Sequence, residues 1–316
     1  MKVMKYILVL IMVGTFMNAN ANEYTVENLS FESAGNQLVG QLYLPAGIEK
    51  PPVVVVTGAW TTVKEQMPSV YAKQLVENGY AAFIFDFAGW GMSEGKNRFV
   101  EDPIAKTYDI EAAVDFLSTL DQVDAERIGG LGICASSGYM VKAYVEQPKL
   151  KTIALVATWL HNPEIATEVY GGPESVASLI AAGEGAQANF EQTGNLTTIE
   201  AASATNDKSL MYQAPYYTET DRGLIPAYDN QFNLASWKPW LTFDAISLAK
   251  KLPGKITFVH SEDAVIPHGV KQFAELGGDK VNGVWLDNIT QFEFYDQPEP
   301  VRLATEAIVK HYSEAL

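Results

Sequence analysis

Residues 127–139 read Arg-Ile-Gly-Gly-Leu-Gly-Ile-Cys-Ala-Ser-Ser-Gly-Tyr, and they contain the only cysteine of the 316-residue chain. A short apolar run leads into Cys134, and the residues from Tyr139 to Gln147 have a helical pattern. This order predicts a strand that turns sharply into a helix and presents the Cys134 side chain at the turn. Gly132 and Ser136 supply the small residues that the crowded backbone needs on either side. The stretch therefore predicts a nucleophile elbow.

Two other interpretations of this stretch stay open at this point. A free cysteine often serves as a small buried hydrophobic residue. A shift of register by two residues would instead put Ser136 at the turn. We favour Cys134 as a reactive residue, because the free N–H groups of the following helix point at the turn and favour a thiolate and an oxyanion beside it.

The first 21 residues have the pattern of a secretory signal peptide. Lys2 and Lys5 precede an apolar core at residues 6–17, and Ala19-Asn20-Ala21 forms a cleavage site. The apolar core is short for a membrane span, and no later segment approaches 18 uninterrupted apolar residues. We therefore expect residues 22–316 to be exported, to the periplasm or the medium, without a membrane anchor.

The composition is acidic and poor in cysteine. The chain has 22 Lys and Arg against 38 Asp and Glu, which gives a formal net charge of −16. Such a charge disfavours nucleic acids and anionic membranes as partners. One cysteine cannot form an internal disulfide, and a chain of this length buries enough apolar surface to fold without one. The oligomeric state is left open.

Short apolar runs alternate with helical patterns over most of the chain, which is typical of a mostly parallel, doubly wound α/β sheet. An antiparallel hairpin is predicted at residues 24–31 and 38–44. The remaining predicted strands are 52–56, 81–85, 127–133, 152–160, 255–260 and 283–286, and the predicted helices are 69–77, 104–120, 139–147 and 301–312. The alternation stops at about residues 161–244, where aromatic residues are frequent. We expect an inserted lid there, over the carboxyl ends of the strands, where such sheets bind ligands.

Three stretches resemble motifs of the α/β-hydrolase superfamily, and the resemblance extends over residues 24–314. Besides the elbow, residues 86–93 (Asp-Phe-Ala-Gly-Trp-Gly-Met-Ser) are similar to the family turn D-x-R-G-x-G-x-S, with Ala88 where arginine is usual. Residues 57–60 (Thr-Gly-Ala-Trp) stand where the family has its H-G-type oxyanion loop. A cysteine at the elbow resembles the dienelactone-hydrolase-like group. The resemblance implies the α/β-hydrolase fold.

The resemblance also implies roles for individual residues. The N–H groups of Ala59 and Ala135 would form the oxyanion hole. Asp263, four residues before Pro267, takes the place of the family's acid. A loop carboxylate or helix N-cap is an alternative role for Asp263, and Glu262 is an alternative acid.

The place of the family's histidine is taken by Gln291, within the sequence Ile-Thr-Gln-Phe-Glu-Phe-Tyr at residues 289–295. An amide has no titratable nitrogen and cannot act as a general base. Of the four histidines, His161 has the best position to serve Cys134, because it follows a predicted strand at its carboxyl end. A thiolate attacks without a base if the helix lowers its pKa. His161 or Gln291 would then orient the water that releases the acyl group.

The predicted function is hydrolysis of a small-molecule ester, lactone or thioester through an acyl-enzyme on Cys134. A non-catalytic ligand-binding protein with this fold, an acyl transferase and, more weakly, a peptidase stay open as alternatives. We expect no cofactor and no metal, because no nucleotide-binding glycine motif follows a strand in the C-terminal half and no cysteine–histidine cluster has metal-ligand spacing.

Overall fold

The computed structural model describes residues 24–316, and the predicted signal peptide at residues 1–21 lies outside this range. One sheet contains eight strands in the order β1-β2-β4-β3-β5-β6-β11-β12. The first two strands form an antiparallel hairpin whose second strand pairs antiparallel with β4, and the other pairs are parallel. The strands are β1 (Tyr24–Ser33), β2 (Asn36–Pro45), β3 (Val53–Thr57), β4 (Ala81–Phe85), β5 (Ile128–Ile133), β6 (Leu150–Val156), β11 (Ile256–Ser261) and β12 (Val281–Leu286). The predicted fold class is confirmed.

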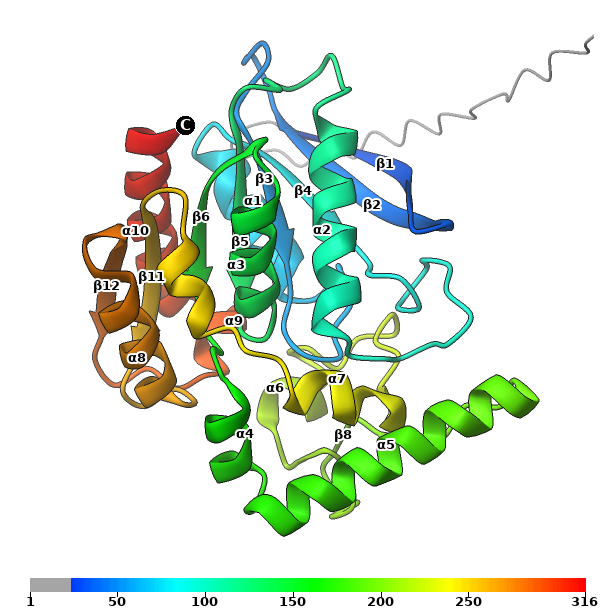
Figure 1. Ribbon diagram of the computed structural model, residues 1–316. Helices are drawn as coiled ribbons and strands as arrows, with labels where there is room; N and C mark the ends of the chain where they lie inside the picture. Colours follow the sequence, from blue (N-terminus) through cyan, green and yellow to red (C-terminus); the bar gives the residue numbers. More distant parts are fainter. Residues whose placement is uncertain (1–23) are drawn as a thin grey trace, which may run out of the picture.

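Helices cover both faces of the sheet (Figure 1). On one face α2 packs beside α3, and on the other α1 packs beside α10. The helices that follow sheet strands are α1 (Met67–Glu77), α2 (Pro103–Leu117), α3 (Ser136–Glu146), α8 (Pro267–Gly277) and α10 (Pro298–Ala315), with the single turn α9 (Glu293–Asp296) before the last. Because helices cover both faces, β3, β4 and β5 are buried along their whole length, which explains their continuous apolar sequences.

β6 ends four residues earlier than the sequence predicts. Ala157 follows its last residue with a φ of 47°, and this left-handed conformation ends the strand. The Ala157 N–H still donates to the Val259 carbonyl at 3.0 Å. The chain from Ala157 to His161 therefore crosses the carboxyl edge of the sheet as a loop, and the carbonyl of Ala157 is free to accept another donor there.

The segment between β6 and β11 leaves the sheet and lies at the carboxyl ends of the strands (Figure 1). We call residues 161–244 of it the lid. The lid contains α4 (Pro163–Val169), the long α5 (Pro173–Thr193), α6 (Pro215–Thr218), α7 (Trp237–Leu241), the short strands β7 (Thr198–Glu200), β8 (Ala202–Ser203), β9 (Met211–Tyr212) and β10 (Gln231–Asn233), and the 3-10 turn η1 (Leu234–Ser236). The 3-10 turn η2 (Ser247–Lys251) follows the lid and packs against α3 and α8. Most of the lid's aromatic rings are buried, namely Tyr216, Tyr217, Tyr228, Phe232, Trp237 and Trp240. These rings belong to one hydrophobic core that continues from the lid into the sheet domain.

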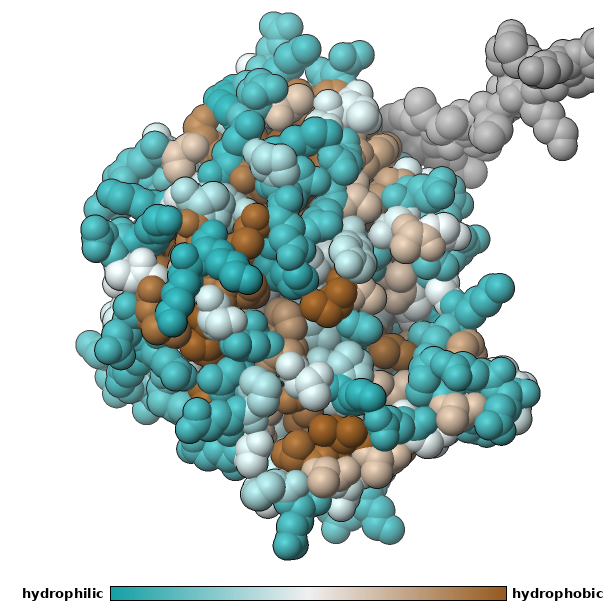
Figure 2. All heavy atoms as spheres, in the orientation of Figure 1, coloured by the Kyte–Doolittle hydropathy of each residue, from teal (hydrophilic) through white to brown (hydrophobic). Residues whose placement is uncertain are grey.

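The face of the molecule in Figure 2 is mostly hydrophilic, and its hydrophobic residues gather in small separate patches. This agrees with the acidic composition. Within residues 24–316, no helix combines the length and the apolar character that crossing a bilayer requires.

Candidate active site

Cys134 lies at the strand-to-helix turn between β5 and α3. Its φ is 57°, a left-handed conformation that costs a non-glycine residue roughly 1–2 kcal/mol. The Cys134 N–H donates to the Val156 carbonyl at 3.0 Å, which ties the turn to β6. A Cβ atom on Gly132 would lie 2.8 Å from the Ser136 carbonyl oxygen, so only glycine fits two residues before the turn. The predicted elbow geometry is present, with Cys134 at its tip.

The Ser136 hydroxyl holds the backbone of the elbow in place. Its Oγ accepts from the Ile133 N–H at 3.0 Å and donates to the Thr57 carbonyl at 2.9 Å, and the side chain is fully buried. These bonds join the elbow to the end of β3. The alternative register, which would place Ser136 at the turn, is therefore wrong.

Cys134 is 7% exposed, and the surroundings of its thiol shift the thiol pKa. Burial raises the pKa of the thiol above its ordinary value, because the thiolate loses its hydration. Hydrogen bonds from the Tyr295 phenol, the N–H groups of Ala135 and Trp60, and the Gln291 amide favour the thiolate and lower the pKa, but together they do not compensate. The pKa of the thiol is therefore raised, which is opposite to the lowering expected from the helix N-terminus.

Two backbone N–H groups face the sulfur. One belongs to Ala135, a predicted oxyanion donor, and the other belongs to Trp60. The second predicted donor, Ala59, is the preceding residue, and its carbonyl accepts from the Thr62 hydroxyl at 2.6 Å. In the loop after β3, the N–H group that meets the thiol is that of Trp60. The sequence locates this loop, but only the turn within it determines which N–H points at the sulfur.

A buried ion pair supports that loop. The Glu101 carboxylate accepts from the Thr61 N–H at 2.6 Å and from the Lys106 ammonium at 2.7 Å. Its other oxygen accepts from the Tyr139 hydroxyl at 3.1 Å. The Lys106 ammonium also lies 4.6 Å from the centre of the Phe87 ring. No sequence motif pointed to Glu101, because its partners lie in three separate segments.

Gln291 lies in the place that the resemblance assigns to a histidine, beside the thiol. Its Nε2 donates to the Ala157 carbonyl at 2.7 Å and to the Tyr295 hydroxyl at 3.0 Å. Its Oε1 accepts from the Val265 N–H at 3.3 Å. A carbonyl only accepts and an N–H only donates, so these partners fix the orientation of the amide. Gln291 is therefore a rigid hydrogen-bond donor at the site.

Asp263 is exposed, and the structure does not bring it to the thiol. Its N–H donates to the Ser261 hydroxyl at 3.2 Å. Within residues 24–316, no hydrogen bond joins the Asp263 carboxylate to Gln291 or Cys134. In the family, an acid in this position orients a histidine by accepting from its second ring nitrogen. Here a glutamine oxygen occupies that place and takes a backbone N–H from Val265.

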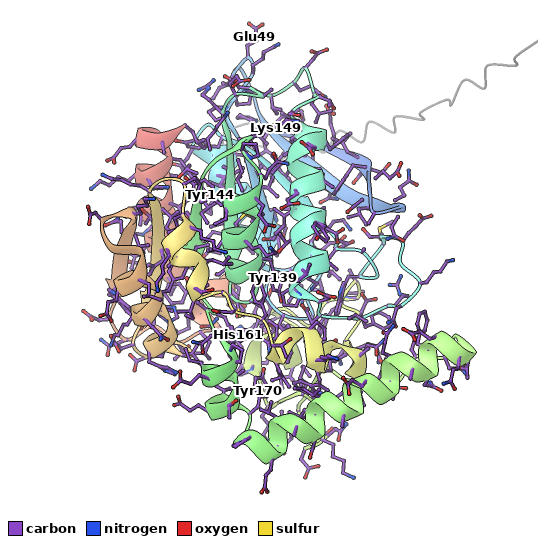
Figure 3. All side chains as sticks on the ribbon, in the orientation of Figure 1. Glu49, Tyr139, Tyr144, Lys149, His161 and Tyr170 are labelled. Atoms are coloured by element: carbon purple, nitrogen blue, oxygen red, sulfur yellow. The ribbon has the colours of Figure 1, made fainter. Side chains whose placement is uncertain are left out.

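His161 does not serve Cys134, so this prediction is wrong. Its Nδ1 accepts from the Trp159 indole N–H at 3.0 Å, and its Nε2 donates to the Trp240 carbonyl at 2.9 Å. Both nitrogens are thus occupied, and burial lowers the pKa of the imidazole. His161 instead joins the end of β6 to the lid, and Figure 3 labels it there beside Tyr170.

The other three histidines make contacts away from the thiol. His260 is buried at the end of β11, its ring centre 5.5 Å from that of Trp285, and burial lowers its pKa to about 4. His311 shares a 2.7 Å hydrogen bond with the Thr152 hydroxyl. His268 is exposed, 3.7 Å from the Glu168 carboxylate.

Aromatic rings surround the site from both sides. The Trp60 ring stacks on Trp240 of the lid, with ring centres 4.9 Å apart. On the other side, the Tyr295 ring packs edge-on against Tyr216 and Tyr217, at 5.0 and 6.4 Å. The lid therefore closes over the elbow with apolar surface.

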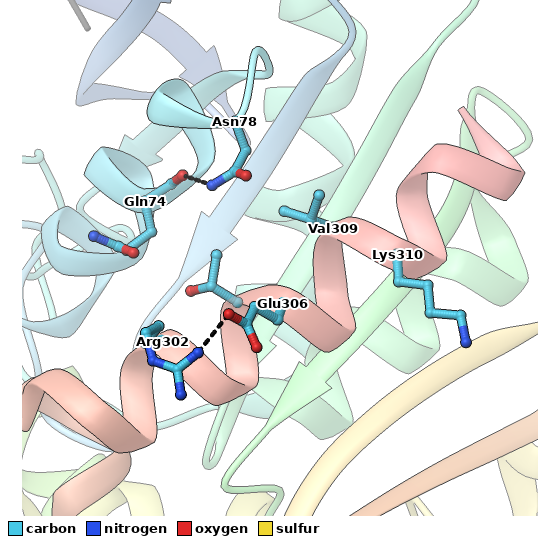
Figure 4. Close-up of a pocket in the computed structure, with 7 residues that line it drawn as sticks. Gln74, Asn78, Arg302, Glu306, Val309 and Lys310 are labelled. Carbon is cyan, nitrogen blue, oxygen red and sulfur yellow. Dashed lines mark hydrogen bonds and ion pairs between the residues drawn. The ribbon is translucent and has the colours of Figure 1, made fainter. Parts of the chain in front are cut away.

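Nothing in the described part of the chain gathers three or more His, Cys, Asp or Glu side chains for a metal ion. A separate groove lies between α1 and α10, lined by Gln74, Asn78, Arg302, Glu306 and neighbouring residues (Figure 4). None of the residues around the thiol lines this groove.

The chain is similar in sequence to several known proteins. A family model described as FrsA-like esterase matches residues 15–170, just under half of the chain. Escherichia coli K12 YcjY is 29% identical over 70% of this chain and 76% of its own length. Pseudomonas aeruginosa PA2218 is 29% identical over 73% of this chain and 65% of its own. The thiohydrolase aneE of Aspergillus aculeatus is 24% identical over 76% of this chain and 80% of its own.

Solved structures share the fold. The crystal structure of PA2218 superposes with a TM-score of 0.82 at 22% identity, covering 96% of this chain and 99% of that one. The α/β-hydrolase GrgF from Penicillium sp. sh18 superposes with a TM-score of 0.76 at 17% identity, covering 92% of this chain and 96% of its own.

Proposed function

We propose that this chain, which has the α/β-hydrolase fold and belongs to that superfamily, cleaves a small-molecule ester, lactone or thioester through an acyl-enzyme on Cys134. The observation that carries the proposal is the position of Cys134. Its thiol stands at the tip of a strained elbow, with the N–H groups of Ala135 and Trp60 directed at it. Backbone strain at a single residue is a frequent feature of catalytic sites.

This arrangement fits the chemistry of acyl transfer. A carbonyl carbon approaching the sulfur brings its oxygen near the same two N–H groups, which would stabilise the oxyanion as it forms. Losing one such donor costs a hydrolase about 2.7–4 kcal/mol of transition-state stabilisation. The match to an FrsA-like esterase model and the likeness to a thiohydrolase support hydrolysis of an ester or thioester.

The aromatic surroundings favour an apolar acyl group. Trp60 and Trp240 on one side and Tyr295 on the other present apolar faces next to the thiol. The Trp60 indole N–H is buried and has no hydrogen-bond partner in the described residues. Such a donor is available to a polar atom of the substrate.

The proposal is tested by intact-mass measurement and turnover with a panel of nitrophenyl esters and acyl thioesters of increasing chain length. We expect the wild-type protein to gain the mass of one acyl group and to release product. Cys134→Ala should do neither. If Cys134→Ala retained the wild-type turnover, Cys134 would not be the nucleophile. If neither protein were acylated or turned over substrate while both bound it, the chain would be a ligand-binding protein of this fold.

Export is a second part of the proposal, carried by the pattern of residues 1–21. Expression of the full chain in a Gram-negative host should yield a periplasmic or secreted protein that begins near Asn22. N-terminal sequencing of the fractionated protein tests this, and an uncleaved cytoplasmic chain would contradict it.

A further inference from the structure

Tyr295 lies in the single helical turn α9, and its hydrogen-bond partners determine where its hydroxyl proton can go. The Gln291 Nε2 donates to the Tyr295 oxygen at 3.0 Å, so the phenol is an acceptor in that bond. The phenol in turn hydrogen-bonds to the sulfur of Cys134. Because the amide orientation is fixed by the Ala157 carbonyl and the Val265 N–H, Gln291 can only donate to the Tyr295 oxygen. The phenol proton is therefore left for the sulfur or for a bound substrate.

The position of Tyr295 is held by contacts on all sides. Its side chain is 1% exposed. The lid residue Arg222 forms a two-point ion pair with the neighbouring Asp296, at 2.6 and 2.7 Å, and donates to the Phe292 carbonyl at 2.9 Å. The Tyr71 hydroxyl donates to the Phe294 carbonyl at 2.7 Å. A single turn clamped from the lid and from α1 keeps the phenol at the sulfur.

We infer that Tyr295 is a catalytic residue of the proposed hydrolase, where it carries protons between Cys134 and the substrate in place of the missing histidine. The inference rests on the function proposed above. In the described residues, Tyr295 is the titratable side chain that hydrogen-bonds to the sulfur, whereas Asp263 is exposed and His161 is engaged elsewhere.

The proton balance requires no other group. In acylation, the Cys134 sulfur bonds to the carbonyl carbon and the bond to the leaving oxygen breaks. Tyr295 gives its proton to the leaving oxygen and takes the thiol proton, so the products are an alcohol and a neutral acyl-enzyme. In deacylation, water attacks the thioester, one water proton passes to Tyr295, and Tyr295 returns its own proton to the departing sulfur. Burial raises the pKa of Tyr295 well above its ordinary value, so the phenol is neutral at the start of each step.

This role favours one substrate class. An alkoxide leaving group is strongly basic and departs only with a proton, whereas a thiolate leaving group departs readily without one. A site that supplies a phenol proton at this position is therefore suited to alkyl esters or lactones more than to thioesters.

The experiment compares Tyr295→Phe with the wild-type protein on an ethyl ester and an ethyl thioester of the same acyl group, by kcat/KM. We expect a loss of about 10²–10⁴-fold on the ester and less than about tenfold on the thioester. The ratio of the two losses is independent of any unfolded fraction, because both are measured on one preparation. Tyr144→Phe is the control: this buried phenol of α3 donates to the Lys151 carbonyl at 3.2 Å and is not among the residues around the thiol. It should leave both values near wild type.

Equal losses on the two substrates in Tyr295→Phe, with an active wild-type protein, would overturn the proton-transfer role alone. A wild-type protein that neither acylates at Cys134 nor turns over would overturn the proposed function itself.

Discussion

The Glu101 carboxylate accepts a 2.6 Å hydrogen bond from the N–H of Thr61, the residue that follows Trp60 in the loop after β3. Glu101 is fully buried and is paired with Lys106, which is 3% exposed. Burial lowers the pKa of Lys106, and the Glu101 charge acts against this. The oxyanion loop therefore depends on an ion pair that water does not reach.

Removal of the charge on Glu101 should destabilise the fold. Glu101→Gln leaves the Lys106 ammonium buried without a counterion, so we expect the free energy of unfolding to fall by about 3–5 kcal/mol in urea titrations. The double change Glu101→Gln with Lys106→Met should recover much of this loss, because neither charge then remains buried. Glu184→Gln, which breaks the exposed pair with Lys238, is the control and should cost at most about 1 kcal/mol. An equal effect at Glu101 and Glu184 would contradict the buried-pair account.

The reactivity of Cys134 should increase with pH. Because burial raises the pKa of the thiol, we expect the rate of alkylation by iodoacetamide to rise through a midpoint above about 8.5, the ordinary value. The same chain unfolded in urea has the same single thiol and should titrate near the ordinary value. Because the folded pKa is the higher one, the protonated thiol adds to the free energy of unfolding below the unfolded pKa. This contribution is lost as the pH rises through the folded pKa. A folded midpoint below the unfolded one would contradict the structure.

A histidine at position 291 should create the missing base. The Gln291 amide already lies beside the sulfur, so Gln291→His would place an imidazole within reach of the thiol. We expect kcat/KM for a nitrophenyl ester at pH 7 to rise by more than tenfold, towards the 10²–10⁴ that a positioned base contributes. An unchanged or lower rate would show that the site does not use a base here. Asp263→Asn in this background tests the acid: a fall in activity would mean that Asp263 reaches the new imidazole.

The ion pair between the lid and α9 should hold the loop that carries Gln291 and Tyr295. Arg222→Gln removes the two-point contact between Arg222 and Asp296. The Arg222 side chain is 14% exposed and that of Asp296 is 17% exposed. We expect faster amide hydrogen exchange in residues 290–296, measured by mass spectrometry, and slower ester turnover. Arg302→Gln is the control, because Arg302 forms exposed pairs within α10 (Figure 4) and should leave exchange in 290–296 unchanged. Unchanged exchange in Arg222→Gln would contradict the clamp.

The sequence predicted the sheet and the elbow with small errors at element ends. Continuous apolar runs identify buried parallel strands, and the glycine before Cys134 is required by a clash that any side chain would make. The exception was β6, whose apolar sequence continues past Val156 while the backbone turns at Ala157. A turn of this kind has no signal in hydrophobic periodicity.

The candidate site was predicted less completely. Tyr295 stands in the same string as Gln291, four residues later, so its position was visible while its bond to the sulfur was not. His161 was misassigned because a place at a strand end does not reveal that the lid takes both ring nitrogens.

The parallel sheet and the place of Cys134 at its turn could be predicted from the amino-acid sequence, because both depend on neighbouring residues and on backbone crowding. The glutamine at position 291 is read from the sequence directly. The packing of distant segments, in contrast, places Trp60 and Tyr295 beside the thiol and raises its pKa by burial. Burial is the sum of contacts from the whole lid, and Tyr295 meets Cys134 across more than 150 residues of chain. Contacts between such distant segments are set by how the elements pack and not by any local pattern.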